Sequence, residues 1–307
     1  MVRSKMPRLL DRIFTYRLPV TIESPLIKSL GDLETFIDIA GSDPMFNKYF
    51  IAVNIPNMPL GRLSLDPFIS AIKIRDSIGI DVIPHLSVAL ETEYTLVRTL
   101  ITASEFRINN ILLVGGDIKL NSSIDVFHAL NIINQLRSGF IRLAGREYKL
   151  DPIKFSVGAA LIPWRRGEDN IVFRKVKSGV SFFQTQYIFD TSISNLICNI
   201  VKIADKYQYS IGKFAILLGL LPTLNNYTAS VISKIYGPSI SKTLSRYINN
   251  IRGYRKFLKE LLGKILDECT EYVGKLVKIG VHIMPIKWSR DLLTDIYLLI
   301  DDLKSSV

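Results

Sequence analysis

The chain has 307 residues, a formal net charge of +11 and a hydrophobic content of 48%. This length suffices for two small domains or one large α/β barrel, and the apolar content allows a sizeable core. No apolar run approaches the ~18–20 residues that span a bilayer, and the basic residues 1–14 lack the apolar stretch and cleavage site of a signal peptide, so a membrane span and export are not expected.

Short runs rich in β-branched and aromatic residues recur along the chain and predict eight strands. In order, they are VTIE near Val20, YFIAV near Tyr49, DVIPH near Asp81, NILLV near Asn110, FSVGA near Phe155, SFFQTQ near Ser181, FAILLG near Phe214 and GVHIM near Gly280. Apolar residues at helical spacing over 65–78 and 91–106 predict helices between them. Strands alternating with helices at intervals of about 30 residues or more indicate parallel βαβ units.

Eight such units in a chain of this size predict a single (β/α)8 TIM barrel domain over residues 1–307. A doubly wound parallel sheet is the alternative. The long interval 225–279 after the seventh strand leaves room for extra helices, and no linker or low-complexity segment divides the chain.

The excess positive charge favours anionic partners. Much of it lies in residues 241–264, which we interpret first as the solvated face of an amphipathic helix. A site for a polyanionic substrate tail, a membrane surface or nucleic acid are the alternatives, but no recognised nucleic-acid motif is present and no such partner is expected. The two cysteines have no metal-type spacing, so we expect no metal site and a cytoplasmic location.

Polar residues stand at the ends of several predicted strands. These are Glu23, Asn54, His85, Asp117, Thr185 and Gln186. Because the active site of a TIM barrel lies at the carboxyl ends of its strands, they predict one mouth lined by acid, base and amide groups. Of the two glutamines, we expect Gln184 to point into packing or toward the helices. We expect Gln186 to turn into this mouth, because the two share a strand face only if the strand stays regular, and a strand that leaves a barrel commonly bends at its end.

Six segments in order resemble the methylenetetrahydrofolate reductase family, and the resemblance covers nearly the whole chain. They are TIESP, DVIPHLS, NNILLVGGD, FRKVKSGVSFFQTQYIFD, GLLPTLNN and GVHIMP. The resemblance implies an FAD-containing barrel that uses NADH or NADPH to reduce methylenetetrahydrofolate, or an archaeal pterin analogue, to the 5-methyl form.

The resemblance also implies roles for single residues. Glu23 matches the general acid and contacts the substrate, and Asp117 matches the aspartate beside the flavin. The other matches are Asn54, His85 and Lys175 at the flavin, and Gln186 with Thr185 at the pterin. A donating Glu23 must be protonated, so we expect burial or Asp117 to raise its pKa.

Each match has a structural alternative. Glu23 and Asp117 fit helix caps, the latter for a helix near 122–135; His85 fits a buried barrel histidine and Lys175 a helix end. His128 and His282 are interpreted as structural.

The chain also departs from the family pattern. Gly115 replaces an arginine, Ile162 replaces an aromatic or amide residue, and residues 89–92 lack the usual polar pattern. These positions lie on the flavin side, so the resemblance supports pterin binding more strongly than FAD binding. Three alternatives therefore stay open: a flavin-independent reductase, a non-catalytic pterin- or C1-carrier-binding barrel that acts as a subunit or regulator, and a nucleic-acid- or membrane-associated protein built on the basic segment near Arg246–Lys264. A homo-oligomer is compatible with any of them.

Overall fold

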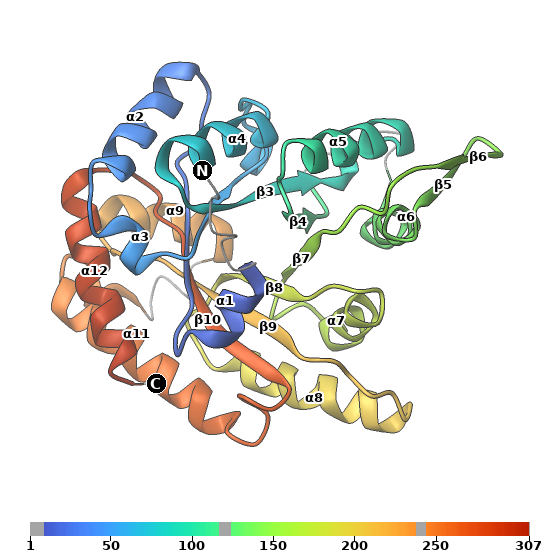
Figure 1. Ribbon diagram of the computed structural model, residues 1–307. Helices are drawn as coiled ribbons and strands as arrows, with labels where there is room; N and C mark the ends of the chain where they lie inside the picture. Colours follow the sequence, from blue (N-terminus) through green and yellow to red (C-terminus); the bar gives the residue numbers. More distant parts are fainter. Residues whose placement is uncertain (1–8, 117–123, 238–243, 307) are drawn as a thin grey trace.

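The computed structural model describes residues 9–116, 124–237 and 244–306 (Figure 1). Eight parallel strands close into a barrel in the order β1-β10-β9-β8-β7-β4-β3-β2. They are β1 (Val20–Glu23), β2 (Ala52–Ile55), β3 (Asp81–Ser87), β4 (Asn110–Val114), β7 (Ser156–Leu161), β8 (Phe182–Tyr187), β9 (Phe214–Leu220) and β10 (Val277–Ile283). The predicted TIM barrel is confirmed.

Helices surround the barrel and connect successive strands (Figure 1). They are α2 (Leu30–Gly41), α3 (Phe46–Tyr49), α4 (Pro67–Ile78), α5 (Glu93–Glu105), α6 (Val126–Arg137), α7 (Glu168–Lys177), α8 (Ser192–Lys206), α9 (Asn226–Tyr236), α11 (Ile251–Glu268) and α12 (Arg290–Lys304), with the short 3₁₀ turns η1 (Pro59–Gly61), η2 (Val88–Leu90) and η3 (Ser245–Tyr247). The elements α9, η3 and α11 fill the interval after the seventh barrel strand, as predicted.

Local sequence explains where these helices begin and end. Asp66 accepts hydrogen bonds from the backbone N–H groups of Phe68 and Ile69 and so caps α4, which ends at Gly79 in the left-handed conformation. Ser29 and Asp32 form a reciprocal capping box at the start of α2.

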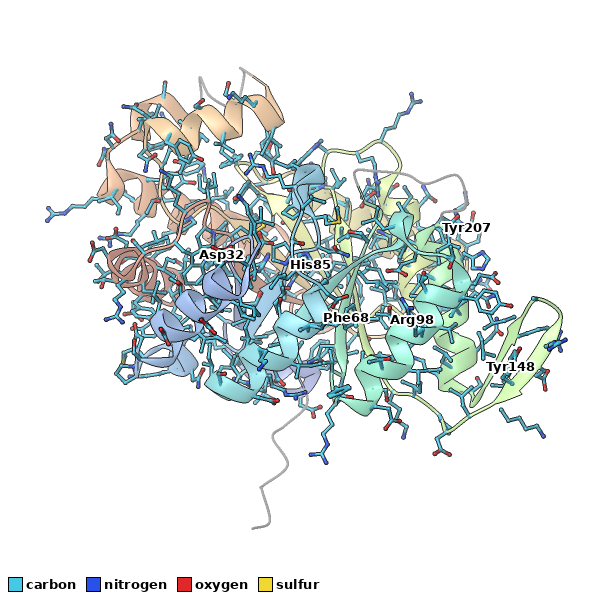
Figure 2. All side chains as sticks on the ribbon, turned by 90° about the horizontal axis from the view of Figure 1, so that it is seen from above. Asp32, Phe68, His85, Arg98, Tyr148 and Tyr207 are labelled. Carbon is cyan, nitrogen blue, oxygen red and sulfur yellow. The ribbon has the colours of Figure 1, made fainter. Side chains whose placement is uncertain are left out.

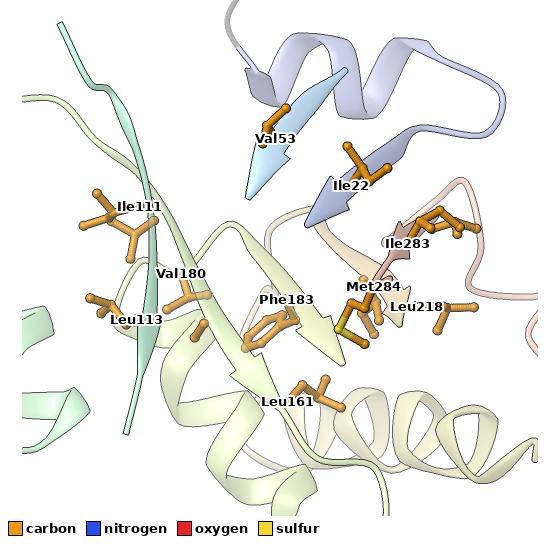
Figure 3. Packing of buried hydrophobic residues seen from close by; sticks show 14 of the residues in the cluster. Ile22, Val53, Ile111, Leu113, Leu161, Val180, Phe183, Leu218, Ile283 and Met284 are labelled. Carbon is orange, nitrogen blue, oxygen red and sulfur yellow. The ribbon is translucent and has the colours of Figure 1, made fainter. Parts of the chain in front are cut away.

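The strand sequences are apolar runs, because helices cover one face of each strand and the barrel interior covers the other. One face packs outward against the helices through residues such as Ile22, Val53, Phe183 and Leu218 (Figure 3). The opposite face of each strand points into the barrel, where alternate residues along the strand meet.

The short helix α1 (Leu9–Thr15) closes the amino-terminal end of the barrel. Leu9 and Ile13 are fully buried in a cluster with inward-facing strand residues that include Phe182 and Leu217. Arg12 of the same helix forms an ion pair with Asp81 at the start of β3, at 3.2 Å. Helix α1 therefore gives the barrel an apolar floor.

Three details differ from the sequence-based expectations. The second strand begins at Ala52, because Tyr49 belongs to the short helix α3. An unpredicted antiparallel hairpin of β5 (Phe140–Leu143) and β6 (Arg146–Lys149) projects from the barrel between α6 and β7 (Figure 1). The N-cap of α6 is Asp125, so the capping role considered for Asp117 is filled by another residue. None of the described helices is long and apolar enough to cross a membrane.

Candidate functional site

The interior of the barrel changes from apolar to polar toward the carboxyl ends of its strands. Phe182, Ile83 and Ala52 belong to the apolar floor with α1. Two residues further along the same strands are Gln184, His85 and Asn54, which therefore also point inward. Figure 2 shows His85 near the middle of the barrel in a view from above.

A chain of polar contacts joins β1, β2 and β10 at this level. His282 Nε2 lies 3.6 Å from Glu23 Oε2, and His282 Nδ1 lies 3.0 Å from Thr21 Oγ1 and 3.4 Å from Asn54 Nδ2. The hydroxyl of Thr21 and the amide of Asn54 can both donate to Nδ1. In that arrangement Nε2 carries the proton and faces the carboxylate of Glu23.

The backbone of Glu23 is fixed independently of its carboxylate. The indole Nε1–H of Trp288 donates to the Glu23 carbonyl oxygen at 3.1 Å, and the next residue, Ser24, donates its backbone N–H to the carbonyl of Asn54 at 2.8 Å. The carboxylate is free to face the mouth, and its side chain is 24% exposed.

The electrostatics of Glu23 correct one expectation. Burial acts to raise the pKa of Glu23, but the hydrogen bond from His282 and the electrostatic influence of His282 and His85 outweigh it, so the pKa lies below its ordinary value. The predicted elevation is therefore wrong for the protein without ligand. His282, which the sequence analysis had interpreted as structural, is the direct partner of this carboxylate.

His85 is held neutral. Burial lowers the pKa of His85 to about 4; the charge of Glu23 opposes this shift and that of His282 adds to it. At neutral pH the imidazole is therefore an uncharged group with one donor and one acceptor nitrogen.

Four buried polar atoms around this chamber have no hydrogen-bond partner among the described residues. They are Asn54 Oδ1, His85 Nε2, Gln184 Nε2 and Gln184 Oε1. Buried polar groups are rarely left unpaired, because each such group costs about 1–3 kcal/mol. These four atoms come from inward-facing residues at one level of the barrel, and a ligand that offers both donors and acceptors would satisfy them.

The end of β8 explains the two glutamines. The pairing of β8 with β9 is irregular between Gln184 and Tyr187, as at a β-bulge. Gln184 is buried inside the barrel, so of the two expected placements, in packing or toward the helices, the second is wrong. Gln186, beyond the start of this irregularity, is exposed, and its Oε1 lies 3.4 Å from the hydroxyl of Tyr236.

Thr185 holds this irregular segment in place. Its hydroxyl donates to the carbonyl of Gln186 at 2.7 Å and accepts the backbone N–H of Gly219 at 2.8 Å. A Cβ on Gly219 would lie 2.6 Å from the carbonyl oxygens of both Thr185 and Gln186, so this close approach requires glycine.

An aromatic wall, made of Trp164, Tyr187, Phe189 and Tyr236, stands beside Gln186. Tyr236 makes edge-to-face contacts with Trp164 and Phe189, at centroid distances of 5.1 and 5.8 Å, and its hydroxyl accepts the backbone N–H of Tyr187 at 3.0 Å. Sequence reasoning missed this wall, because its members come from three separate segments and share no spacing.

The residues expected at the flavin do not all come together. Asn54 and His85 present unpaired atoms to the chamber, as a ring edge would need. The Lys175 ammonium donates instead to the carbonyl of Ala160 at 2.7 Å, and burial lowers its pKa to about 8. Gly115 offers no side chain, and Asp117 lies outside the described residues. Of the described residues at these positions, Asn54 and His85 thus fit a heterocyclic ring, while the Lys175 ammonium is bound to the backbone of β7.

Two further expectations concern charge and metals. The basic segment largely forms α11, whose residues Tyr254, Leu258 and Ile265 are buried while most of its charged residues lie toward solvent, as in an amphipathic helix. Arg255 is the exception, because it is largely buried against α12, where its Nε lies 3.4 Å from Asp302 Oδ2. Within residues 9–116, 124–237 and 244–306, no group of three or more His, Cys, Asp or Glu residues is arranged to hold a metal ion.

Comparisons with known proteins concern the family and the fold. The sequence model of a family described as methylenetetrahydrofolate reductase matches residues 66–297. Among solved structures, an uncharacterized protein from Clostridium thermocellum that binds two copies of 5-methyl-5,6,7,8-tetrahydrofolic acid has a similar fold, with a TM-score of 0.71 and 16% sequence identity over 97% of this chain and 98% of that chain. A search of curated proteins finds no match.

Proposed function

This chain belongs to the methylenetetrahydrofolate reductase family, and from that premise we propose that it binds a reduced folate or related tetrahydropterin in the barrel mouth. There it reduces the methylene form to the 5-methyl form with NADH or NADPH as the hydride donor. The observation that carries the proposal is the set of unpaired atoms of Asn54, His85 and Gln184 beside the carboxylate of Glu23. The ligand bound by the Clostridium thermocellum protein belongs to the same chemical class.

The proposed reaction needs one proton and one hydride. Opening of the methylene bridge breaks the bond from the bridging carbon to N10, which takes the proton, and leaves an iminium at N5. A hydride from C4 of the dihydronicotinamide then adds to the iminium carbon, giving the methyl group and the oxidised nicotinamide. No step is derived through a flavin; when bound, a flavin would relay the same hydride.

Glu23 can supply the proton. Its carboxyl group takes up a proton through the mouth, where the side chain is 24% exposed, and donates it to N10, while the Nε2–H of His282 faces Oε2 and positions the group. Thr21 and Asn54 hold the imidazole in position through Nδ1. The carboxylate left after donation stabilises the cationic iminium until the hydride arrives.

A non-catalytic pterin-binding role is the second candidate. The lowered pKa of Glu23 favours it, because a carboxylate that stays ionised binds a ligand without donating a proton. Two measurements on the purified protein separate the candidates: titration with 5-methyltetrahydrofolate and oxidation of NADH or NADPH in the presence of methylenetetrahydrofolate. Binding with turnover supports the reductase, binding without turnover supports the second candidate, and absence of binding contradicts both.

Replacing Gln186 with leucine tests the pterin contact that the family resemblance assigns to it. We expect about tenfold weaker binding of 5-methyltetrahydrofolate, because the lost amide leaves a polar ligand edge unpaired. Isothermal titration gives the affinity, and Gln208→Leu on the loop after α8 is the matched exposed control. Equal affinities in the parent protein and Gln186→Leu would remove Gln186 from the binding site.

A further inference from the structure

Gln184 is a buried amide that the proposed chemistry does not use. Only 4% of the residue is exposed, and neither its Oε1 nor its Nε2 has a hydrogen-bond partner among the described residues. It lies above Phe182 on β8, so the polar amide stands directly over the apolar floor of the barrel.

The neighbouring strands offer Gln184 no side-chain hydrogen bond. Its register partners are Ala160 on β7 and Leu217 on β9, and the next inward position of β9 is Gly219. Alanine and glycine also fill little volume. The nearest bulky group at Gly219 is Met284, whose Cε would lie 2.5 Å from a Cβ placed there. The unbranched methionine side chain can move aside without disturbing the strand.

A glutamine in this position needs a physical reason. An apolar residue of the same length would fill the space without leaving a buried donor and acceptor unpaired. A primary amide presents one N–H and one C=O side by side, so its complement is another amide edge with adjacent C=O and N–H groups. Lactam rings of pterins and the carboxamide of nicotinamide both carry such an edge.

The groups around Gln184 favour an uncharged part of a ligand. His85 is neutral, and the carboxylate of Glu23 is paired with His282 at 3.6 Å. Among the described residues, no lysine or arginine side chain forms a hydrogen bond or ion pair with Asn54, His85 or Gln184. A neutral, planar, amide-bearing ring therefore suits the floor better than an anionic tail.

We propose that Gln184 is a second ligand-binding amide, which pairs with the amide edge of the ring that enters the barrel most deeply. This inference rests on the proposed function and deepens it by assigning a ligand contact separate from that of Gln186. The ring is either the pterin or the nicotinamide. If it is the pterin, removal of the amide weakens binding of the folate; if it is the nicotinamide, removal weakens binding of the dinucleotide.

The test compares Gln184→Met with the parent protein and with Gln186→Met. Each protein is titrated separately with 5-methyltetrahydrofolate and with NAD⁺ and NADP⁺, and its melting temperature is measured without ligand. We expect Gln184→Met to bind one ligand class at least tenfold more weakly, and to melt at the same or a higher temperature, because the unpaired amide is gone. Weaker binding of the folate would identify the pterin as the ring that pairs with Gln184, and weaker binding of the dinucleotides would identify the nicotinamide.

Two results would overturn the inference while the proposed function stands: unchanged affinities in Gln184→Met for every ligand that the parent binds, or a lower melting temperature, which would mean that the amide already has an internal partner. A parent protein that binds neither ligand class contradicts the proposed function itself and this inference with it.

Discussion

Replacing Glu23 with glutamine is expected to lower the rate of methylene-pterin reduction by about 100-fold or more, the usual scale for loss of a general acid. The amide keeps the shape of the side chain and can still accept a hydrogen bond from His282 Nε2, but it cannot pass a proton to N10. Steady-state oxidation of NADH or NADPH with saturating methylenetetrahydrofolate measures the effect.

Two accompanying measurements distinguish the loss of proton donation from a loss of folding or ligand binding. The exposed Glu34 on α2 gives the matched control, Glu34→Gln, which should keep the parent rate. Binding of 5-methyltetrahydrofolate to Glu23→Gln should change much less than turnover, because the proton is needed only in the reaction. A variant that turns over as fast as the parent would show that Glu23 is not the proton donor.

The second large effect concerns the dependence of stability on pH. The pKa of His85 is about 4 in the folded protein and about 6.5 in an unfolded chain. Between these values the unfolded chain binds a proton that the folded protein does not, so the free energy of unfolding falls as the pH is lowered from about 6.5 to 4. The loss amounts to roughly 3 kcal/mol over this window, at about 1.4 kcal/mol for each pH unit.

Guanidinium unfolding at pH 7 and pH 4.5 checks this result in the parent and in His85→Asn. Carboxylates add to the acid loss in both proteins, so the informative quantity is the difference between them: the variant should lose about 2–3 kcal/mol less than the parent. The exposed His128→Asn should behave as the parent does. Parallel losses in the parent and His85→Asn would contradict a neutral, buried His85.

The barrel could be predicted from sequence because each parallel strand is buried on both faces and so reads as a short apolar run. The hairpin of β5 and β6 escaped this rule, since every residue of β6 is exposed and no apolar alternation marks it. Its turn did carry a signal: Ala144 and Gly145 both have positive φ, as a two-residue hairpin turn requires, and glycine is common there.

The site could be predicted only in part. Glu23, Asn54 and His85 stand at strand ends, where the fold itself predicts function. The inward direction of His282 could have been predicted from the alternation of side chains along a strand. It lies two residues after the inward Gly280 and pairs in register with Thr21. The choice between Gln184 and Gln186 was beyond the sequence, since the irregular pairing between Gln184 and Tyr187 breaks the alternation on which the choice depended.

Helix α1 has a consequence for the order of events. Because it closes the amino-terminal end of the barrel, a ligand can reach Gln184 only from the carboxyl ends of the strands. If the proposed pterin and nicotinamide share this route, the ring that pairs with Gln184 must bind before the outer ring and leave after it.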